Sequence, residues 1–201
     1  MTCRHCWFAD YKNKKHAMRI IGGKYKHKRF DVPRSFKARP TTDFAKENLF
    51  NILSNVYFDF DDAPTALDLF AGTGSIGLEF LSRGCGKVIS VEKDFQHYRF
   101  LTEVSKQMSD AAWKPVLADV FKYVERNQEK FDIIFADPPY TLEKLGDIPD
   151  IILGKDILNE GGVFILEHGK QHKFDNNPYL IDHRVYGAVN FSFFQKPAEK
   201  A

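Results

Sequence analysis

The chain has 201 residues, of which 43% are hydrophobic and 28% are charged, a composition typical of a globular protein rather than a disordered or collagenous one. No apolar run approaches the roughly 20 residues of a membrane-spanning helix, and the N-terminus lacks the apolar core of a signal peptide. Three cysteines are too few for a disulfide framework. We therefore expect one domain, or one domain with an appendage, in the cytoplasm and without a membrane partner.

Charge is distributed unevenly along the chain. Residues 1–40 contain twelve Lys or Arg and two Asp, a net charge of +10, whereas the other 161 residues contain seventeen Lys or Arg against twenty-five Asp or Glu, a net charge of −8. A basic segment ahead of an acidic body favours contact with a polyanion, although such runs are often only solvated tails.

The first seventeen residues show neither a strand period nor a helix period. Cys3, Cys6 and His16 resemble part of a zinc site, but structural zinc needs four well-placed ligands, so we expect no metal site. We predict that residues 1–17 form a disordered extension or lie upstream of a true start at Met18.

Short elements precede the main body of the chain. The residues around Gly22 and Gly23 predict two short strands in which basic and aromatic side chains alternate. The run from Thr41 to Asp43 is typical of a helix start, because a hydroxyl can cap the first turn and an acid favours it. Apolar residues at helical spacing then predict one buried helix face: Ala45, Leu49, Ile52, Leu53 and Val56. A polar linker follows at 59–64.

From residue 65 onward, strand and helix patterns alternate. Strands are predicted at 65–70, 87–92, 115–118, 131–136 and 161–168, and helices at 75–83, 94–108, 119–126 and 142–158. Two antiparallel strands are predicted near 180–186 and 189–194. This alternation predicts an α/β fold with a doubly wound, mostly parallel sheet.

The strongest local motif is G-x-G-x-x-G, formed by Gly72, Gly74 and Gly77 between a strand and a helix, where nucleotide cofactors bind. Glu92 ends the next strand, a position from which an acid accepts hydrogen bonds from ribose hydroxyls. The motif alone fits NAD as well as S-adenosylmethionine.

Two further acids favour S-adenosylmethionine. Asp68 lies four residues before Gly72, where a carboxylate suits a cationic sulfonium and amino group better than a diphosphate. Asp119, just after the third strand of the alternating series, is placed to accept from an adenine amino group. Both acids could instead only cap the loop and the following helix.

The sequence Asp137-Pro138-Pro139-Tyr140 follows the fourth strand of this series, at the end where open α/β sheets bind ligands. Two prolines make the backbone rigid and leave carbonyl oxygens as acceptors. The Asp137 carboxylate and the Pro138 carbonyl could together orient an exocyclic amine, and Tyr140 offers a face for base stacking. The alternative interpretation is a rigid turn with Tyr140 as packing.

Five motifs together carry a resemblance to a known family. The segments RIIGGKYK, RPTTD, DLFAGTGSIGLEFLSRG, VEKD and DPPY resemble the RsmD-type family of bacterial 16S rRNA guanine-N2 methyltransferases, from Met18 to about Phe194. DPPY alone marks amino-group methyltransferases on DNA, RNA or protein. The first two segments make the resemblance more specific.

The resemblance implies a class I S-adenosylmethionine-dependent methyltransferase with a Rossmann-like seven-stranded sheet that ends in an antiparallel hairpin. Its substrate would be one guanine of 16S rRNA on the 30S subunit or an assembly intermediate, and we expect a monomer. The implied catalytic residues are Asp137, Pro138, Pro139 and Tyr140. The implied cofactor-binding residues are Asp68, Phe70, Ala71, Gly72, Thr73, Gly74, Gly77, Glu92, Lys93, Asp119 and Val120.

We expect RNA to bind the basic residues of a segment at 18–60, ahead of a methyltransferase domain at 61–201. Phosphate contacts of this kind position a substrate without reading its bases. Arg39 is expected nearest the active site. The candidate residues are Arg19, Lys24, Lys26, Lys28, Arg29, Arg34, Lys37, Arg39 and Thr41.

Three other functions stay open from the sequence. An adenine-N6 methyltransferase shares DPPY but usually needs a separate target-reading region. A nicotinamide oxidoreductase fits the glycine loop and leaves DPPY unexplained. A non-catalytic RNA-binding assembly factor could keep the fold without turnover. We interpret His168, Cys85 and the segment 191–194 as structural.

Overall fold

The computed structural model describes residues 17–33, 35–36 and 42–197. The possible zinc ligands, together with Arg34, Lys37, Arg39 and Thr41, lie outside these described residues.

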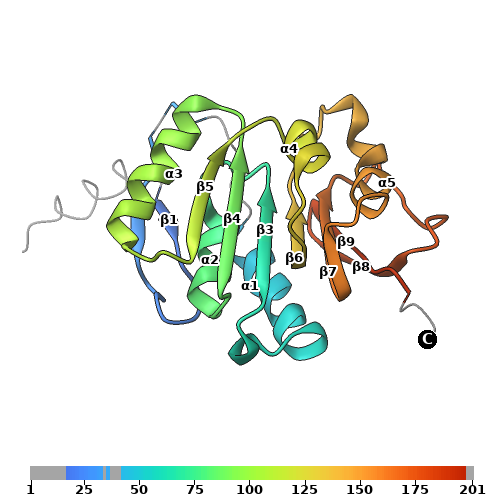
Figure 1. The fold of residues 1–201 in the computed structure, drawn as a ribbon, viewed down its shortest axis with the longest axis horizontal. Coiled ribbons are helices and arrows are strands. Elements are labelled where there is room, and N and C mark those ends of the chain that lie inside the picture. The colour runs from blue at the N-terminus through green and yellow to red at the C-terminus, as the bar shows by residue number, and fades with distance from the viewer. Residues whose placement is uncertain (1–16, 34, 37–41, 198–201) are drawn as a thin grey trace, which may run out of the picture.

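A seven-stranded sheet crosses the molecule in the order β5-β4-β3-β6-β7-β9-β8 (Figure 1). β3 to β7 are mutually parallel, and β9 pairs antiparallel with both β7 and β8. The predicted doubly wound, mostly parallel sheet with a C-terminal antiparallel hairpin is therefore confirmed. The strands are β3 (Thr65–Leu69), β4 (Lys87–Glu92), β5 (Trp113–Leu117), β6 (Phe131–Ala136), β7 (Leu158–His168), β8 (Leu180–Tyr186) and β9 (Val189–Phe194).

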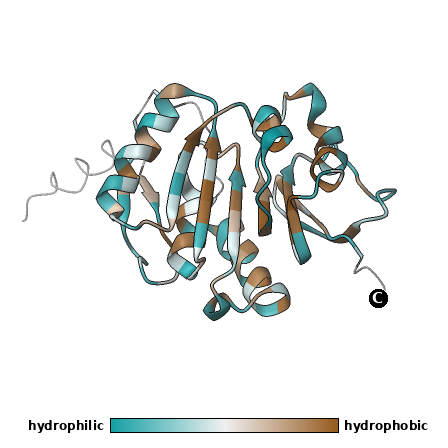
Figure 2. Ribbon diagram, viewed as in Figure 1, coloured by the Kyte–Doolittle hydropathy of each residue, from teal (hydrophilic) through white to brown (hydrophobic). Residues whose placement is uncertain are grey.

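Helices cover both faces of the sheet. The apolar residues of α2 and α3 pack in one core, and those of α4 and α5 pack in a second core on the other face. The central strands β4 and β6 are largely hydrophobic (Figure 2), as expected for parallel strands buried on both faces. The helices are α2 (Ser75–Arg83), α3 (Phe95–Met108), α4 (Val120–Arg126) and α5 (Ile148–Leu153). No helix of the described ranges is long and apolar enough to cross a membrane.

The N-terminal segment adds a hairpin and a helix. β1 (Ala17–Arg19) pairs antiparallel with β2 (Arg29–Asp31), and Gly22 and Gly23 lie in their connection, as predicted. α1 (Asp43–Ile52) begins with the predicted hydroxyl cap, because Thr42 Oγ1 accepts a hydrogen bond from the Ala45 amide at 3.2 Å. Apolar side chains of all three elements belong to the first core.

The buried face predicted for this helix is wrong at its end. Ala45, Leu49 and Leu53 are buried, but the Val56 side chain is 64% exposed. The chain continues α1 as a π-helix over Leu53–Tyr57. A π-helix has more residues per turn than an α-helix, so the register shifts and Val56 turns toward solvent.

The helix predicted at 142–158 is also wrong. The structure has a 3-10 helix at Glu143–Asp147, then the short α5, and residues 158–160 belong to β7. Pro149 favours a new helix start because its ring supplies no N–H. Leu158 pairs with Phe131 in the sheet, so its apolar side chain serves strand packing. β5 likewise begins two residues earlier than the predicted 115, at Trp113.

A buried acid joins the N-terminal hairpin to the sheet-covering helix α2. Glu79 is fully buried, and its carboxylate accepts hydrogen bonds from the amides of Ile21 and Gly22 at 2.8 and 2.7 Å. Arg83 donates to the same carboxylate at 3.0 Å. The carboxylate thus fixes the hairpin connection against α2.

Lys46 completes this network from α1. Its ammonium lies 3.8 Å from the Glu79 carboxylate and donates to the Arg19 carbonyl at 2.6 Å and to Ser75 Oγ at 2.9 Å. Burial lowers the pKa of Lys46, although the charge of Glu79 opposes this. Because Ser75 is the first residue of α2, the network links β1, α1 and the helix that follows the glycine loop.

Glu79→Gln should lower the free energy of unfolding by about 3 kcal/mol, because it leaves the buried Lys46 ammonium without its countercharge. Urea denaturation measures the change. Glu125→Gln on α4, where the side chain is exposed, is the matched control and should change the value by less than about 0.5 kcal/mol. Equal stability of the two variants would contradict the role given to Glu79.

Candidate active site

The order in which the chain adds strands to the sheet reverses next to β3. β3 pairs with β4 on one side and with β6 on the other, and the chain runs outward to β5 before it returns to β6. The loops after β3 and β6 therefore diverge, and a crevice opens at the carboxyl ends of these strands. A cavity of about 920 Å³ lies there. A second hollow, of about 640 Å³, is lined by Gly23, Arg83 and residues 54–60 and shares no lining residue with the first.

The glycine loop forms one wall of this cavity. Phe70 ends the strand segment with a left-handed φ of 60°, a strained conformation for a side chain of this size. A Cβ at Gly77 would collide with Ser90 Oγ and lie 2.9 Å from Asp68 Oδ2. Only glycine lets the start of α2 approach β3 and β4 this closely. Of the loop residues predicted to bind cofactor, Phe70, Ala71, Gly72 and Thr73 line the cavity, whereas Gly74 and Gly77 do not.

Asp68 is buried beneath the loop and lines the cavity. Its Oδ2 accepts from the Gly77 amide and from Ser90 Oγ, each at 3.1 Å. Burial raises the pKa of the Asp68 carboxyl to about 7, against the lowering effect of these two hydrogen bonds. Asp68 therefore both caps the loop, which was the alternative interpretation from sequence, and places an acid at the cavity.

Glu92, at the end of β4, accepts hydrogen bonds from two separate backbone segments. Its carboxylate accepts from the Gly72 amide at 2.8 Å and from the Asp94 amide at 2.7 Å. The His97 ring lies 4.0 Å away. Glu92 and Lys93 line the same cavity as the loop, so the structure brings together the acid and the glycines that the sequence singled out.

Asp119 lies differently. It caps α4, since its Oδ1 accepts from the Lys122 amide at 3.1 Å. Its neighbour Val120 lines the cavity, whereas Asp119 does not. The capping alternative describes its observed contact.

The segment 137–140 forms the opposite wall. Asp137, Pro138, Pro139 and Tyr140 all line the cavity, and the Asp137 amide donates to the Leu69 carbonyl at 3.4 Å. Burial raises the pKa of Asp137 well above its usual range, and the charges of Glu167 and Asp68 add to this. Tyr140 is 38% exposed as a whole residue, and its hydroxyl donates to Glu167 Oε1 at 3.4 Å.

Several cavity residues carried no assignment from sequence. Glu167 comes from β7, Phe44 from the first turn of α1, and Tyr186 from the end of β8. The rings of Phe44 and Tyr186 lie edge to face, 6.0 Å apart. The ring centroids of Phe36 and His97 lie 4.2 Å apart, and both residues line the cavity. Only the sheet register and the N-terminal helix bring these residues together.

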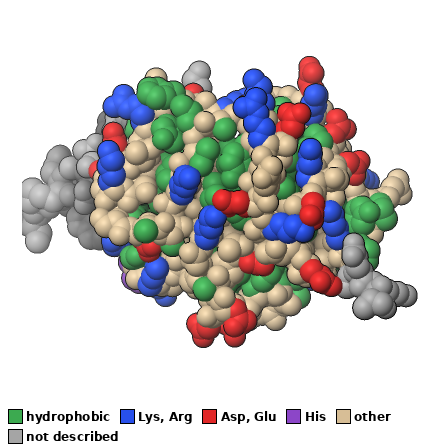
Figure 3. Space-filling view, in the orientation of Figure 1, with side chains coloured by type: hydrophobic (Ala, Val, Ile, Leu, Met, Phe, Trp, Pro, Cys, Tyr) green, Lys and Arg blue, Asp and Glu red, His purple; other side chains and the backbone are tan. Residues whose placement is uncertain are grey.

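The described basic residues differ in how they are engaged. Arg19 pairs with Asp43 at 2.7 Å. Lys24 pairs with Asp110 at 2.9 Å, and this bond is the main reason that the pKa of Lys24 is raised. Lys26 and Arg29 are exposed. On the face drawn in Figure 3, basic and acidic side chains are interspersed rather than gathered by sign.

The residues interpreted as structural are buried. His168 is fully buried and bonds to the Gly169 carbonyl and Ser192 Oγ. Cys85 is buried, and burial raises the pKa of its thiol to about 12. The phenylalanines of 191–194 belong to the sheet core.

Comparison with known proteins identifies the family. The model of the family "Conserved hypothetical protein 95" matches residues 18–195. The chain belongs to this family. It is 32% identical to YlbH of Bacillus subtilis (strain 168), over 89% of this chain and 99% of that protein.

A sequence and a solved structure from Escherichia coli extend the comparison. Ribosomal RNA small subunit methyltransferase D of strain K12 is 28% identical, over 90% of this chain and 91% of its own length. The solved structure of the methyltransferase-like protein YhhF superposes with a TM-score of 0.78 at 27% identity, and covers 91% of this chain and 99% of that one. The superposition shows that this chain shares the fold of YhhF.

The raised pKa of Asp68 predicts a pH dependence of stability for the cofactor-free protein. Because the folded pKa of about 7 exceeds the usual 3.8, the folded protein binds more protons than the unfolded chain between these values. The free energy of unfolding should therefore fall as pH rises through this window, by up to about 1.4 kcal/mol per pH unit.

Asp68→Asn removes this titration, so urea denaturation at about pH 5 and pH 7 should show a smaller decline in the variant than in the wild type. Asp175→Asn, at an exposed position, is the control and should keep the wild-type decline. A decline that Asp68→Asn leaves unchanged would contradict the assigned pKa.

Proposed function

We propose that this protein is an S-adenosylmethionine-dependent methyltransferase that modifies the exocyclic N2 amine of a guanine in 16S rRNA, on the 30S subunit or an assembly intermediate. The observation that carries the proposal is the gathering of the glycine loop and the segment 137–140 in one cavity at the switch point of the sheet. The names of relatives such as Ribosomal RNA small subunit methyltransferase D support the substrate class.

The charge of the cavity fits S-adenosylmethionine. Five acidic side chains line it, against the single ammonium of Lys93 and the His97 ring; they belong to Asp68, Glu92, Asp94, Asp137 and Glu167. A lining of this sign attracts a sulfonium and an amino group and repels a diphosphate. It therefore disfavours the nicotinamide oxidoreductase. The volume of about 920 Å³ lies within the range of small-molecule sites and leaves room for a base.

The residues that would hold this cofactor lie in the two walls of the cavity. When bound, S-adenosylmethionine supplies an electrophilic methyl group. Glu92 would accept from the ribose hydroxyls, Asp68 would face the cationic end, and the backbone of 70–73 would border the ligand. Val120 and Phe70 provide apolar surface for an adenine ring.

The segment 137–140 would present the nucleophile. The lone pair of a guanine amine is delocalised into the base, so two acceptors on its hydrogens are needed to orient it. The Asp137 carboxyl and the Pro138 carbonyl supply them, and positioning contributes most of the rate. The raised pKa of Asp137 suits a group that takes up the amine proton late. Tyr140 would stack on a base turned out of its loop.

Two alternatives make different predictions. An adenine-N6 methyltransferase would use the same acceptor pair, and the product nucleoside separates it from the proposal. A non-catalytic assembly factor would have no need of the buried Asp137, which desolvation makes costly to ionise. The retained acids therefore favour an enzyme.

The experiment offers labelled S-adenosylmethionine with unmethylated 30S particles, naked 16S rRNA and duplex DNA, and identifies the labelled nucleoside by mass. We expect label in N2-methylguanosine from particles or rRNA. Label in N6-methyladenine would overturn the base assignment. Absence of label with RNA binding intact would instead support the assembly factor.

Asp137→Ala should reduce kcat at least about 100-fold, because it removes both the orienting acceptor and the proton acceptor. Binding of S-adenosylmethionine, measured by calorimetry, should change little. Asp147→Ala, at an exposed position at the end of the 3-10 helix after the segment, is the control and should retain activity. Parallel losses of binding and turnover in Asp137→Ala would contradict the role.

Lys26→Gln combined with Arg29→Gln should weaken rRNA binding and lower the slope of log affinity against log salt by about 2, since each charge neutralises roughly one phosphate. The matched control is Lys87→Gln combined with Lys155→Gln, both exposed and outside the N-terminal segment. Filter binding at several salt concentrations measures the slopes, and identical slopes for both pairs would contradict RNA contact by Lys26 and Arg29.

A further inference from the structure

Glu167 stands beside Asp137 because of the sheet register. β6 and β7 are parallel neighbours, and Ala136 is paired with Leu166. The next residue along the chain is therefore Asp137, directly after β6, and Glu167 in the neighbouring β7. Neighbouring strands lie about 4.8 Å apart, so the two acids leave the sheet next to each other.

The two carboxylates also face the same way. Side chains alternate along a strand, and Phe135 and Ile165, two residues earlier, both belong to the first core. Asp137 and Glu167 share that face, and both line the cavity. The charge of Glu167 contributes to the raised pKa of Asp137, as expected for close neighbours. The Glu167 side chain is buried, at 4% residue exposure.

We propose that Glu167 determines the choice of guanine, by accepting the ring N1–H while Asp137 accepts from the N2 amine beside it. This inference rests on the proposed function and deepens it. It assigns to a buried acid of β7 the discrimination between the bases that carry an exocyclic amine.

The chemistry of the base edges supports this assignment. Guanine presents two adjacent donors, the N1–H and the N2 amine, which two adjacent carboxyl groups can receive together. Adenine and cytosine present an amine beside an unprotonated ring nitrogen, so a carboxylate would meet a lone pair there. Buried polar groups left unpaired in this way give strong discrimination between substrates.

The surrounding contacts hold the proposed acceptor in place. The Tyr140 hydroxyl donates to Glu167 Oε1 at 3.4 Å, so the ring expected to stack on the base is linked to the acid expected to read its edge. Glu167 is paired with Phe191 of β9, a fully buried residue. The backbone at Glu167 is therefore fixed by sheet pairing with β9, and the preceding Leu166 is also paired with β6.

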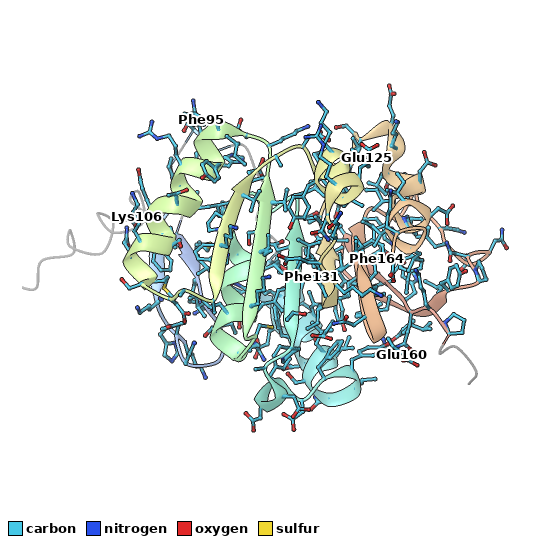
Figure 4. The ribbon with its side chains drawn as sticks, in the orientation of Figure 1. Phe95, Lys106, Glu125, Phe131, Glu160 and Phe164 are labelled. Atoms are coloured by element: carbon cyan, nitrogen blue, oxygen red, sulfur yellow. The ribbon has the colours of Figure 1, made fainter. Side chains whose placement is uncertain are left out.

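The test is an internal competition. The substrate is 16S rRNA assembled by ligation of chemically synthesised fragments, in which a low fraction of the guanosine is replaced by 2-aminopurine riboside. This nucleoside keeps the 2-amine but has an unprotonated N1. Wild type, Glu167→Gln, Glu167→Asp and the control Glu160→Gln each methylate this RNA. Glu160 is exposed near the start of β7, at the other end of the strand (Figure 4). Mass analysis gives the ratio of the two methylated nucleosides in each reaction.

We expect wild type, Glu160→Gln and Glu167→Asp to prefer guanosine, because each keeps an acidic acceptor in the cavity. Glu167→Gln should lose about 10- to 100-fold of this preference, since its amide can donate to the unprotonated N1. Binding of S-adenosylmethionine should be unchanged. The ratio is internal to each reaction, so a smaller folded fraction of a variant does not alter it.

Other outcomes separate the two proposals. If wild type forms no N2-methylguanosine, the proposed function fails. If wild type forms it and Glu167→Gln keeps the full preference, the role of Glu167 fails alone. Loss of all activity in both Glu167→Gln and Glu167→Asp also overturns it, because an acid retained one methylene shorter should still read the base. If Glu167→Gln is inactive and Glu167→Asp keeps the preference for guanosine, the result supports the proposal that an acid is needed at this position.

Discussion

The site depends on burying several carboxylates at one point of a parallel sheet. Strand order reverses beside β3, so the ends of β3, β6 and β7 project Asp68, Asp137 and Glu167 into one cavity. Desolvation raises the pKa of Asp68 and of Asp137, so this arrangement costs stability in the free protein. A cationic ligand and a base edge rich in donors would offset that cost. The same constraint thus explains both the cofactor and the substrate that we propose.

The N-terminal segment is built into this arrangement rather than appended to it. Glu79 binds the amides of the hairpin connection, and Lys46 reaches from α1 to Ser75 at the start of α2. α1 in turn carries Phe44 to the rim of the cavity. The segment that we propose to bind RNA is therefore coupled by buried polar contacts to the helix that begins the proposed cofactor wall.

Local patterns were sufficient for most of the fold and for the two motifs. The bounds of α2, β4, β6, β8 and β9 follow from apolar runs flanked by glycines and acids, and they match the structure. The burial predicted for Val56 was wrong because the π-helix depends on tertiary packing. The helix predicted at 142–158 was wrong because the strand pairing of Leu158 also depends on tertiary packing. Glu167, Phe44 and Tyr186 carry no local signature. They become site residues only through strand register and helix placement, which bring distant parts of the chain together.

The most direct measurement is a crystal structure of the protein with S-adenosylhomocysteine. The account predicts the ligand in the cavity at the ends of β3 and β6, with its ribose against Glu92, its amino acid end near Asp68, and its sulfur facing open space beside Asp137. A ligand bound instead in the hollow formed by residues 54–60, or one whose sulfur lies away from Asp137, would contradict the account.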